Sequence, residues 1–475
     1  WNLPTVVEAA DGTVTASSYD SLGRVTKTGI ANTAELLYTY TNGYLSRIQR
    51  TAVRNGSSIS QTYTLANDAF GNMTELHVGT RKLASYVYND SGTLLTRQTY
   101  GNGASVDFTY DELDRIKTAK YSDGLEVSYT YTGDGQLMCD AVMHTLDAKK
   151  FYRKWINDIA ACHYYYDTLG RLIYSDQRNH GGAMVQLVSQ GFDTSNRLVS
   201  QGWQFPSGSS TAGYSTTYSY SSTNGTLTAM TTGGMGIGYT YDNLLRLQSA
   251  ASGISSRSYT YRNISSTQTT AQVTKLSYSN LSSGFDFQYS YNNLGNIATY
   301  TAPGEAQVTY TYDNQGQLLK AAGSKTYTYT YDGAGNILTA SDGTSTRTYT
   351  YGDSSWKDLL TAVDGHTIAY DGSGNPTSYH NGTLRWTLGW SNGRQLKSAS
   401  SSAGSISYKY TAGGQRASKT VDGVTHNYYY VGGRLVRETY GSTVLDFFYD
   451  ASGTPFAMKQ GSNTYYYITN LQGDV

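Results

Sequence analysis

A tyrosine-containing turn recurs at a nearly constant interval, and this repeat restricts the fold more than any other feature of the sequence. In the C-terminal half, the aromatic residue that opens the motif returns after 21, 19, 20, 19, 20, 20, 20 and 19 residues. A complete copy reads Tyr331-Asp332-Gly-Ala-Gly335. A period of roughly 20 to 50 residues is typical of repeat architectures, in which each unit buries its surface only against its neighbours. We therefore predict an extended array and not a compact enzyme domain.

The motif begins near the N-terminus and continues to the last residues. Asp and Gly suit a turn because the Asp side chain can accept bonds from the following backbone and Gly adopts positive φ at little cost. The residues predicted to form these structural turns are Tyr19, Asp20, Gly23, Tyr110, Asp111, Tyr166, Asp167, Gly170, Tyr241, Asp242, Tyr291, Gly295, Tyr312, Asp313, Gly316, Tyr331, Asp332, Gly335, Tyr370, Asp371, Gly374, Tyr449, Asp450 and Gly453.

The segment before each turn alternates Tyr with Thr or Ser, as in the run 327–331. Alternation with a period of two indicates a β-strand that places tyrosines on one face and hydroxyl residues on the other. A second short strand follows each turn, so every repeat is predicted to be a β-hairpin. About 40 strands at roughly 4.8 Å each would form a sheet near 200 Å long. Because open twisted sheets seldom exceed about ten strands, this strip must wind on itself as a rod-like solenoid or a wide spiral.

The composition supports this interpretation and excludes several partners. Tyrosine supplies 47 of 475 residues, and Lys+Arg and Asp+Glu balance at 35 each. A neutral chain without a basic cluster is not expected to bind nucleic acid. No run reaches the 18 or so apolar residues that a membrane-spanning helix needs. The chain begins with Trp1 and ends within an expected strand, so we interpret residues 1–475 as one continuous array cut from a larger protein.

The repeat is least regular at about 138–165, a segment that contains both cysteines, Cys139 and Cys162. This segment could hold a short helix or a bent strand pair. If it is a hairpin centred near residue 150, the cysteines face each other within disulfide reach. The alternatives are a disulfide, two unpaired buried thiols, or a zinc site completed by His144 and His163. The last is disfavoured because the spacing does not match usual zinc ligand sets.

Other candidate chemistry is weaker. The loops beginning at Asp332 and Asp371 resemble calcium loops but lack the alternating carboxylates and the terminal Glu, so the turn interpretation is favoured. No nucleophile elbow and no phosphate-binding loop is present. We therefore predict no catalytic residue, no cofactor and no metal. Exposed aromatic side chains could stack on sugar rings, although ladders within the sheet are favoured; the tryptophans considered for this are Trp203, Trp356, Trp386 and Trp390.

The repeat resembles that of the Rhs/YD-repeat family, which includes bacterial Rhs and wall-associated toxins, insecticidal toxin-complex components and teneurins. The pattern Tyr-Asp-x-x-Gly-Arg/Asn-Leu/Ile, as in 166–172 and 331–337, is similar to that family's repeat over essentially the whole chain. The resemblance implies an all-β strip of tandem antiparallel hairpins, wound into a spiral that forms a hollow shell. The C-terminal stretch resembles the segment that leads into the Rhs core. The Asp-Pro pairs of the self-cleavage motif do not occur, so autoproteolysis cannot be transferred.

The functional expectation is a non-enzymatic shell segment of a secreted or cell-surface protein. The resemblance implies that it houses and carries a C-terminal toxin or effector domain of the same polypeptide, which lies outside this sequence. The alternative from another class is an extracellular adhesin or carbohydrate-binding scaffold whose partners are cell-surface glycans.

Overall fold

The computed structural model describes residues 3–9, 13–30, 34–144, 161–178, 183–207, 210–253, 255–279, 285–411 and 413–475. These residues form 43 β-strands, and the described ranges contain no helix. Successive strands pair antiparallel from β1 to β32, and again from β33 to β43. The prediction of an all-β antiparallel strip is therefore confirmed.

The first sheet contains 32 strands. Its first half comprises β1 (Val6–Glu8), β2 (Val14–Tyr19), β3 (Val25–Ile30), β4 (Ala34–Thr41), β5 (Tyr44–Arg54), β6 (Ser57–Asn67), β7 (Met73–Val78), β8 (Arg81–Tyr88), β9 (Leu95–Tyr100), β10 (Ser105–Tyr110), β11 (Ile116–Tyr121), β12 (Leu125–Tyr131), β13 (Leu137–His144), β14 (Ala161–Tyr166), β15 (Leu172–Arg178) and β16 (Met184–Phe192). Its second half comprises β17 (Leu198–Ser207), β18 (Ser210–Tyr220), β19 (Leu227–Thr232), β20 (Met235–Tyr241), β21 (Leu247–Ser252), β22 (Ser256–Asn263), β23 (Thr269–Ser279), β24 (Phe285–Tyr291), β25 (Ile297–Thr301), β26 (Val308–Tyr312), β27 (Leu318–Ala322), β28 (Thr326–Tyr331), β29 (Ile337–Ser341), β30 (Thr346–Thr350), β31 (Ala362–Val363) and β32 (His366–Thr367).

The second sheet contains 11 strands and continues the same path. Its strands are β33 (Ala369–Tyr370), β34 (Pro376–His380), β35 (Arg385–Ser391), β36 (Gln395–Ser401), β37 (Gly404–Tyr410), β38 (Arg416–Val421), β39 (Val424–Val431), β40 (Arg434–Tyr440), β41 (Thr443–Tyr449), β42 (Pro455–Gln460) and β43 (Asn463–Tyr466). The ladder stops between β32 and β33, where the ring of His366 stacks on that of His380 with centroids 4.0 Å apart.

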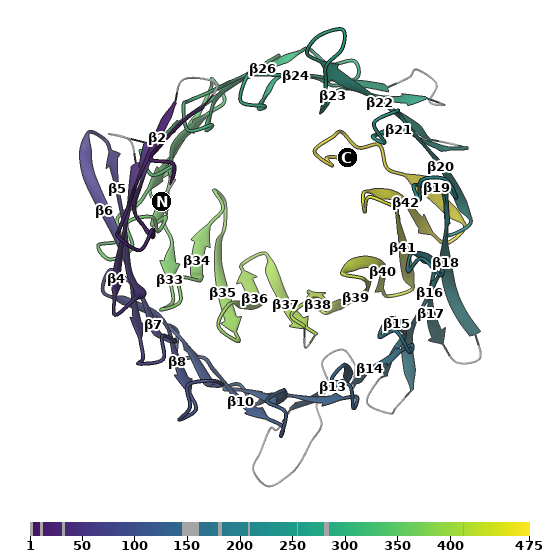
Figure 1. Ribbon diagram of the computed structural model, residues 1–475, viewed down its shortest axis with the longest axis horizontal. Coiled ribbons are helices and arrows are strands. Elements are labelled where there is room, and N and C mark those ends of the chain that lie inside the picture. The colour runs from purple at the N-terminus through teal and green to yellow at the C-terminus, as the bar shows by residue number, and fades with distance from the viewer. Residues whose placement is uncertain are drawn as a thin grey trace.

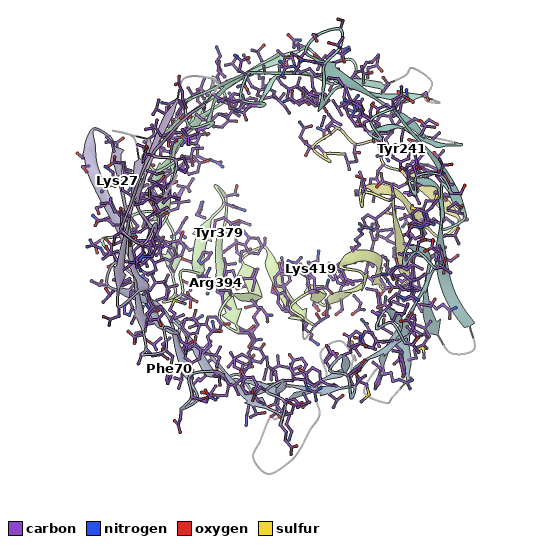
Figure 2. All side chains as sticks on the ribbon, viewed as in Figure 1. Lys27, Phe70, Tyr241, Tyr379, Arg394 and Lys419 are labelled. Atoms are coloured by element: carbon purple, nitrogen blue, oxygen red, sulfur yellow. The ribbon has the colours of Figure 1, made fainter. Side chains whose placement is uncertain are left out.

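The strip curls into a spiral of more than one turn. Strands β1 to β25, the first turn, run around a wide ring, and β33 to β43 lie inside that ring (Figure 1). We call β26 to β43 the second turn. The centre of the ring is open in this view, and the side chains do not fill it (Figure 2). The wound, hollow shape expected from the resemblance is therefore present.

The two faces of the strip differ in chemistry. In β28, Tyr329 and Tyr331 are half-buried, whereas Thr328 and Thr330 are exposed. Hydroxyl groups pair across neighbouring strands on the exposed face, as between the Oγ1 atoms of Thr330 and Thr339 at 2.6 Å. The tyrosine face of the first turn meets the second turn: Tyr239 is buried in a cluster with aromatic residues of β41 and β42. Because β39 to β42 lie inside the ring in Figure 1, the tyrosine face is the inner face there.

Candidate functional site

Many repeat turns are held by one carboxylate, and others by an amide or hydroxyl oxygen, as at Asn292; the turn at Asp332 shows the arrangement. Asp332 Oδ1 accepts the backbone N–H groups of Ala334, at 2.9 Å, and Asn336, at 2.8 Å. The N–H of Gly335 donates to the carbonyl of Asp332 at 3.0 Å, and Gly335 has a φ of 85°. The motif needs Asp for the acceptor and Gly for the left-handed backbone. The loop at Asp332 therefore has the hydrogen bonds of the expected turn.

The other turn residues singled out from the sequence take equivalent places. The same two backbone N–H bonds to a carboxylate Oδ1 occur at Asp20, Asp111, Asp167, Asp242, Asp313, Asp371 and Asp450. Positive φ occurs at the turn glycines Gly23, Gly170, Gly295, Gly316, Gly374 and Gly453.

The tyrosine that opens each turn ties its repeat to the preceding hairpin. The hydroxyl of Tyr312 donates to the carbonyl of Ile297 at 2.8 Å, and that of Tyr331 donates to the carbonyl of Leu318 at 2.9 Å. Equivalent bonds to backbone carbonyls are made by Tyr19, Tyr110, Tyr166, Tyr291, Tyr370 and Tyr449. Tyr241 instead packs against the cluster around Trp203 and Phe448. The register of each hairpin shifts at this tyrosine, as between Thr330 and Tyr331, and the hydroxyl bond fixes the spacing of repeats.

In several first-turn repeats, the turn carboxylate is paired within its own turn. Arg115 lies four residues after Asp111, and its Nε donates to Asp111 Oδ2 at 2.7 Å. The guanidinium of Arg115 also covers the ring of Tyr131 in the next repeat. The Arg115 side-chain bond holds the pKa of Asp111 below its ordinary value. The same pairing joins Asp20 to Arg24, Asp167 to Arg171, Asp193 to Arg197 and Asp242 to Arg246.

In the second turn, three of the corresponding carboxylates are paired with residues of the first turn. Asp332 Oδ2 accepts Arg54 Nε at 2.7 Å, and Asp371 Oδ2 accepts Asn102 Nδ2 at 2.9 Å. Asp450 pairs with Arg257, and both side chains are at most 10% exposed. The residue four positions after these aspartates is Asn or Thr and not Arg. Asn336 and Asn375 each donate to Oδ2 of their own aspartate, and the same oxygen also accepts the partner on the neighbouring turn. We call the line of contacts between the two turns the seam.

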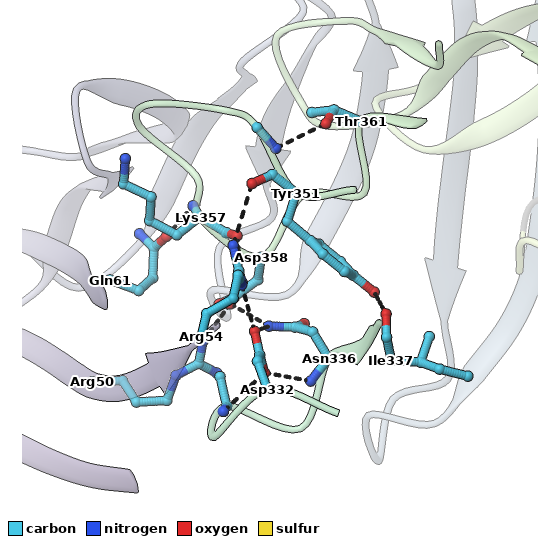
Figure 3. A network of polar contacts seen from close by, with 12 residues as sticks. Arg50, Arg54, Gln61, Asp332, Asn336, Ile337, Tyr351, Lys357, Asp358 and Thr361 are labelled. Atoms are coloured by element: carbon cyan, nitrogen blue, oxygen red, sulfur yellow. Dashed lines mark hydrogen bonds and ion pairs between the residues drawn. The ribbon is translucent and has the colours of Figure 1, made fainter. Parts of the chain in front are cut away.

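An irregular loop at 352–361 closes the spiral where the second turn passes the first. Arg54 donates to the carbonyl oxygens of Tyr351, at 3.2 Å, and Lys357, at 3.0 Å (Figure 3). Asp358 pairs with Arg50 and accepts Asn336 Nδ2 at 2.9 Å. The loop therefore binds strand β5 through two arginines whose side chains are 25% and 11% exposed.

Two further contacts lock this loop. Gln61, which is 1% exposed, donates through Nε2 to the carbonyl of Ser355 at 3.2 Å. Arg81 donates to Asp353 at 2.8 Å. Sequence reasoning missed these residues because it counted Tyr351-Gly352-Asp353 as an ordinary repeat. The sequence signal that could have identified this loop is that residues 352–355 do not follow the Asp-x-x-Gly pattern of the repeat turns.

Farther along, the seam is apolar. Phe448, 1% exposed, packs edge-on against Tyr214 at a centroid distance of 4.9 Å and lies 6.5 Å from the ring of Trp203. Gly233 allows this approach, because a Cβ there would lie 2.3 Å from the Phe448 ring. The C-terminal segment then docks on β23 and β24, where the hydroxyl of Tyr278 donates to the carbonyl of Thr469 at 2.9 Å.

The sequence separation across the seam shrinks along the chain. It is 294 residues for Gln61–Ser355, 244 for Gln186–Tyr430 and 182 for Tyr289–Leu471. Less chain is needed for each circuit, so the spiral tightens toward its C-terminal end. The C-terminus itself lies inside the ring (Figure 1).

The cysteines do not face each other, which corrects the register expected from the sequence. Cys139 pairs with His163, and Cys162 pairs with Asp140. This offset of one residue sends the two side chains to opposite faces of the sheet. Both cysteines are free thiols. Residues 145–160, which include most of the expected helix or strand pair, lie outside the described residues.

The remaining candidates have structural places. Trp203 is 4% exposed, Trp390 donates Nε1 to the carbonyl of Pro376 at 2.7 Å, and Trp356 and Trp386 are half-buried. None of these four side chains is fully exposed. Within the described ranges, no group of three or more His, Cys, Asp or Glu side chains is arranged to hold a metal ion. The described part of the chain also contains no helix long and apolar enough to cross a membrane.

Alkaline pH is expected to open the seam. Burial raises the pKa of Tyr239 and of Tyr289 to about 12. Their hydroxyls accept the N–H groups of Ala451 and Leu471 across the seam. Since an unfolded tyrosine titrates near 10, the unfolded chain binds fewer protons between pH 10 and 12, so stability falls as pH rises through this window. The pH at which circular dichroism reports unfolding should coincide with the pH at which the last tyrosines ionise, measured by the absorbance of tyrosinate. Full tyrosine ionisation in a folded shell would contradict the expectation.

Comparison with known proteins agrees with this geometry. Two solved structures share the fold: a TcdB2–TccC3 crystal structure, 14% identical with a TM-score of 0.58, and the Photorhabdus luminescens Tc holotoxin pore, 13% identical with a TM-score of 0.55. Each match covers 98% of this chain but only 30% and 29%, respectively, of the other chain. This chain thus spans less than a third of those structures. No curated protein matches it in sequence.

A spiral β-strip closed along a seam and surrounding an open centre defines a YD-repeat shell protein. The sequence profile of the Teneurin YD-shell matches residues 2–201 and 285–475, well over half of the chain. The chain therefore belongs to the Teneurin YD-shell family.

Proposed function

We propose that this chain is the closing portion of a shell that encloses and carries a C-terminal effector of the same polypeptide. The observation that carries the proposal is the position of the C-terminus, which lies inside the ring and beside the tightening end of the spiral (Figure 1). Polypeptide that follows Val475 would enter the interior and not the surrounding solvent. The fold shared with the Tc toxin structures supports a shell of this kind.

The role is physical and not catalytic. Buried ion pairs and aromatic packing in the seam hold the two turns of the spiral together. The hydroxyl bonds of the turn tyrosines tie each hairpin to the one before and so fix the curvature of the strip. Every strand except those at the ends of a sheet has two ladder partners, so few strand edges are left to pair with an unfolded cargo. We further propose that the protein acts after secretion or at the cell surface. The adhesin alternative is not favoured, because the tryptophans considered for glycan stacking lie within the sheets or the seam.

This proposal is tested by measuring whether the polypeptide that directly follows Val475 is protected from a protease. A short protease site is inserted directly after Val475 in the polypeptide as its gene encodes it, and the same site is inserted in the exposed hairpin tip at 343–345 as the control. The site after Val475 should resist cleavage under conditions that cut the hairpin site, and acquire sensitivity only when the shell unfolds. Equal cleavage at both sites would show that the chain leaves the shell at Val475 and would overturn the enclosure.

A further inference from the structure

Few backbone bonds hold the β-strip together where the first sheet ends and the second begins. Residues 366–370 form one extended segment that is interrupted at Ile368 and shared between the two sheets. Its first part, β32, pairs with β31, and its last part, β33, pairs with β34. These three strands, β31, β32 and β33, contain two residues each, and every other strand in the described part of the chain contains at least three. We call this junction the break; β33 and β34 lie inside the ring in Figure 1.

Two histidine rings meet where the ladder is missing. The pairing of β33 with β34 stops at Ala369, and continuing its antiparallel register would pair Thr367 with His380. Instead, the ring of His380 in β34 stacks on that of His366 in β32, with the centroids 4.0 Å and the planes 17° apart. His366 is exposed and His380 is half-buried. This stack therefore joins the two sheets at a point where no ladder pair of the described residues does so.

The hydrogen bond of His380 requires a neutral ring. Its Nδ1 accepts the N–H of Gly382 at 3.1 Å, and a protonated imidazole carries a hydrogen on both nitrogens and can accept no bond. Protonation therefore removes the bond that ties His380 to the turn at 381–384. It also places a positive charge against the ring of His366.

The charged groups around the stack oppose protonation. Burial, His366 and Arg385, in that order, hold the pKa of His380 below its ordinary value. Arg385 lies directly opposite His380 in the ladder between β34 and β35. Strand β31 contains no charged residue, and the carboxylate of Asp364, in the turn between β31 and β32, is paired with Arg347 at 3.3 Å. Acid therefore gathers like charges at the break.

We propose that the stack of His366 on His380 is an acid-sensitive contact, and that the β-strip opens at the break when the pH falls below about 6. An unfolded histidine titrates near 6.5, and the closed break binds fewer protons than the open one as the pH drops below that value. The closed state therefore loses stability as the pH falls. Release of an enclosed chain through this opening in an acidic compartment rests on the proposed function, whereas the opening itself does not.

Hydrogen exchange in the polypeptide as its gene encodes it tests this inference. Protection of the amides at 369–370 and 377–380, corrected for the intrinsic exchange rate, should fall by about threefold or more between about pH 7.5 and about pH 5. His380→Asn keeps an acceptor for the Gly382 N–H but cannot be protonated, so its protection should be equal at the two pH values. The matched control is His426→Asn, because His426 Nδ1 lies 2.7 Å from Glu438 Oε1; this variant should keep the pH dependence at the break.

A second variant, His366→Gln, removes one of the two charges and should weaken the pH dependence. Equal protection at both pH values in the unsubstituted polypeptide would overturn the inference, and this measurement needs no variant to fold. A loss of protection in acid that persists in His380→Asn would also overturn it, since another group would then be responsible. Cleavage directly after Val475 at neutral pH overturns the enclosure alone and leaves the acid-sensitive contact in place.

Discussion

Replacing Asp332 by Asn is expected to destabilise the protein by about 3 kcal/mol, because it removes the nearest carboxylate of the buried Arg54 guanidinium and leaves only Asp358, at 3.8 Å, as an ion-pair partner. The Arg54 and Asp332 side chains are only 11% and 0% exposed. Asn keeps the acceptor oxygen that holds the turn, so the substitution removes the ion pair with Arg54 and the bond that Asp332 Oδ2 accepts from Asn336 Nδ2. Equilibrium denaturation in urea measures the loss.

The matched control is Asp20→Asn, which makes the same chemical change in a first-turn repeat. The Asp20–Arg24 pair is 21–30% exposed and lies within one turn, so water can solvate the arginine when the carboxylate is removed. Its effect should be small in comparison. Similar losses for the two variants would mean that the turn itself, and not the contact between turns, gives Asp332 its importance.

The second large effect is expected from Phe448→Ala, which should cost about 4 kcal/mol of stability. Phe448 is 1% exposed and fills the space above Gly233 between the rings of Trp203 and Tyr214. Removing the ring creates a cavity across the apolar part of the seam, and the rigid strands on each side limit its collapse. Thermal and urea unfolding should both report the change.

Phe70→Ala provides the control, since it deletes the same ring from a position that is 61% exposed. Little change is expected in the 475-residue chain. A loss at Phe70 equal to that at Phe448 would indicate that aromatic residues stabilise single repeats and that the contact between turns adds nothing. Together, the two pairs of variants separate the stability of the hairpins from the stability of the spiral.

The local structure follows directly from the sequence. Asp-x-x-Gly forms the turn because Asp332 can accept two backbone N–H groups and Gly335 can take a φ of 85°. Alternation of Tyr and Thr forms strands with one apolar and one hydroxyl face. These interactions span only a few residues, so a repeating motif is sufficient to predict them. The resemblance to the YD-repeat family added the spiral and the hollow centre.

The cysteine register shows where prediction from symmetry stops. Placing a hairpin centre at residue 150 set Cys139 opposite Cys162, but the ladder pairs Cys139 with His163. One residue of offset is below the accuracy of a prediction from spacing, yet it sends the two thiols to opposite faces.

What the sequence determined alone is the repeat unit, because turn and strand preferences act between near neighbours. What only the tertiary structure decided is which repeats meet across the seam. Arg54 and Asp332 are 278 residues apart, and their contact depends on the circumference of the ring. That circumference is the sum of small twists over many strands, and no single repeat encodes it. Asn336 bonds Asp332 within its own turn, as the sequence motif allows, but the bond from Arg54 to Asp332 exists only because the first turn passes at that point.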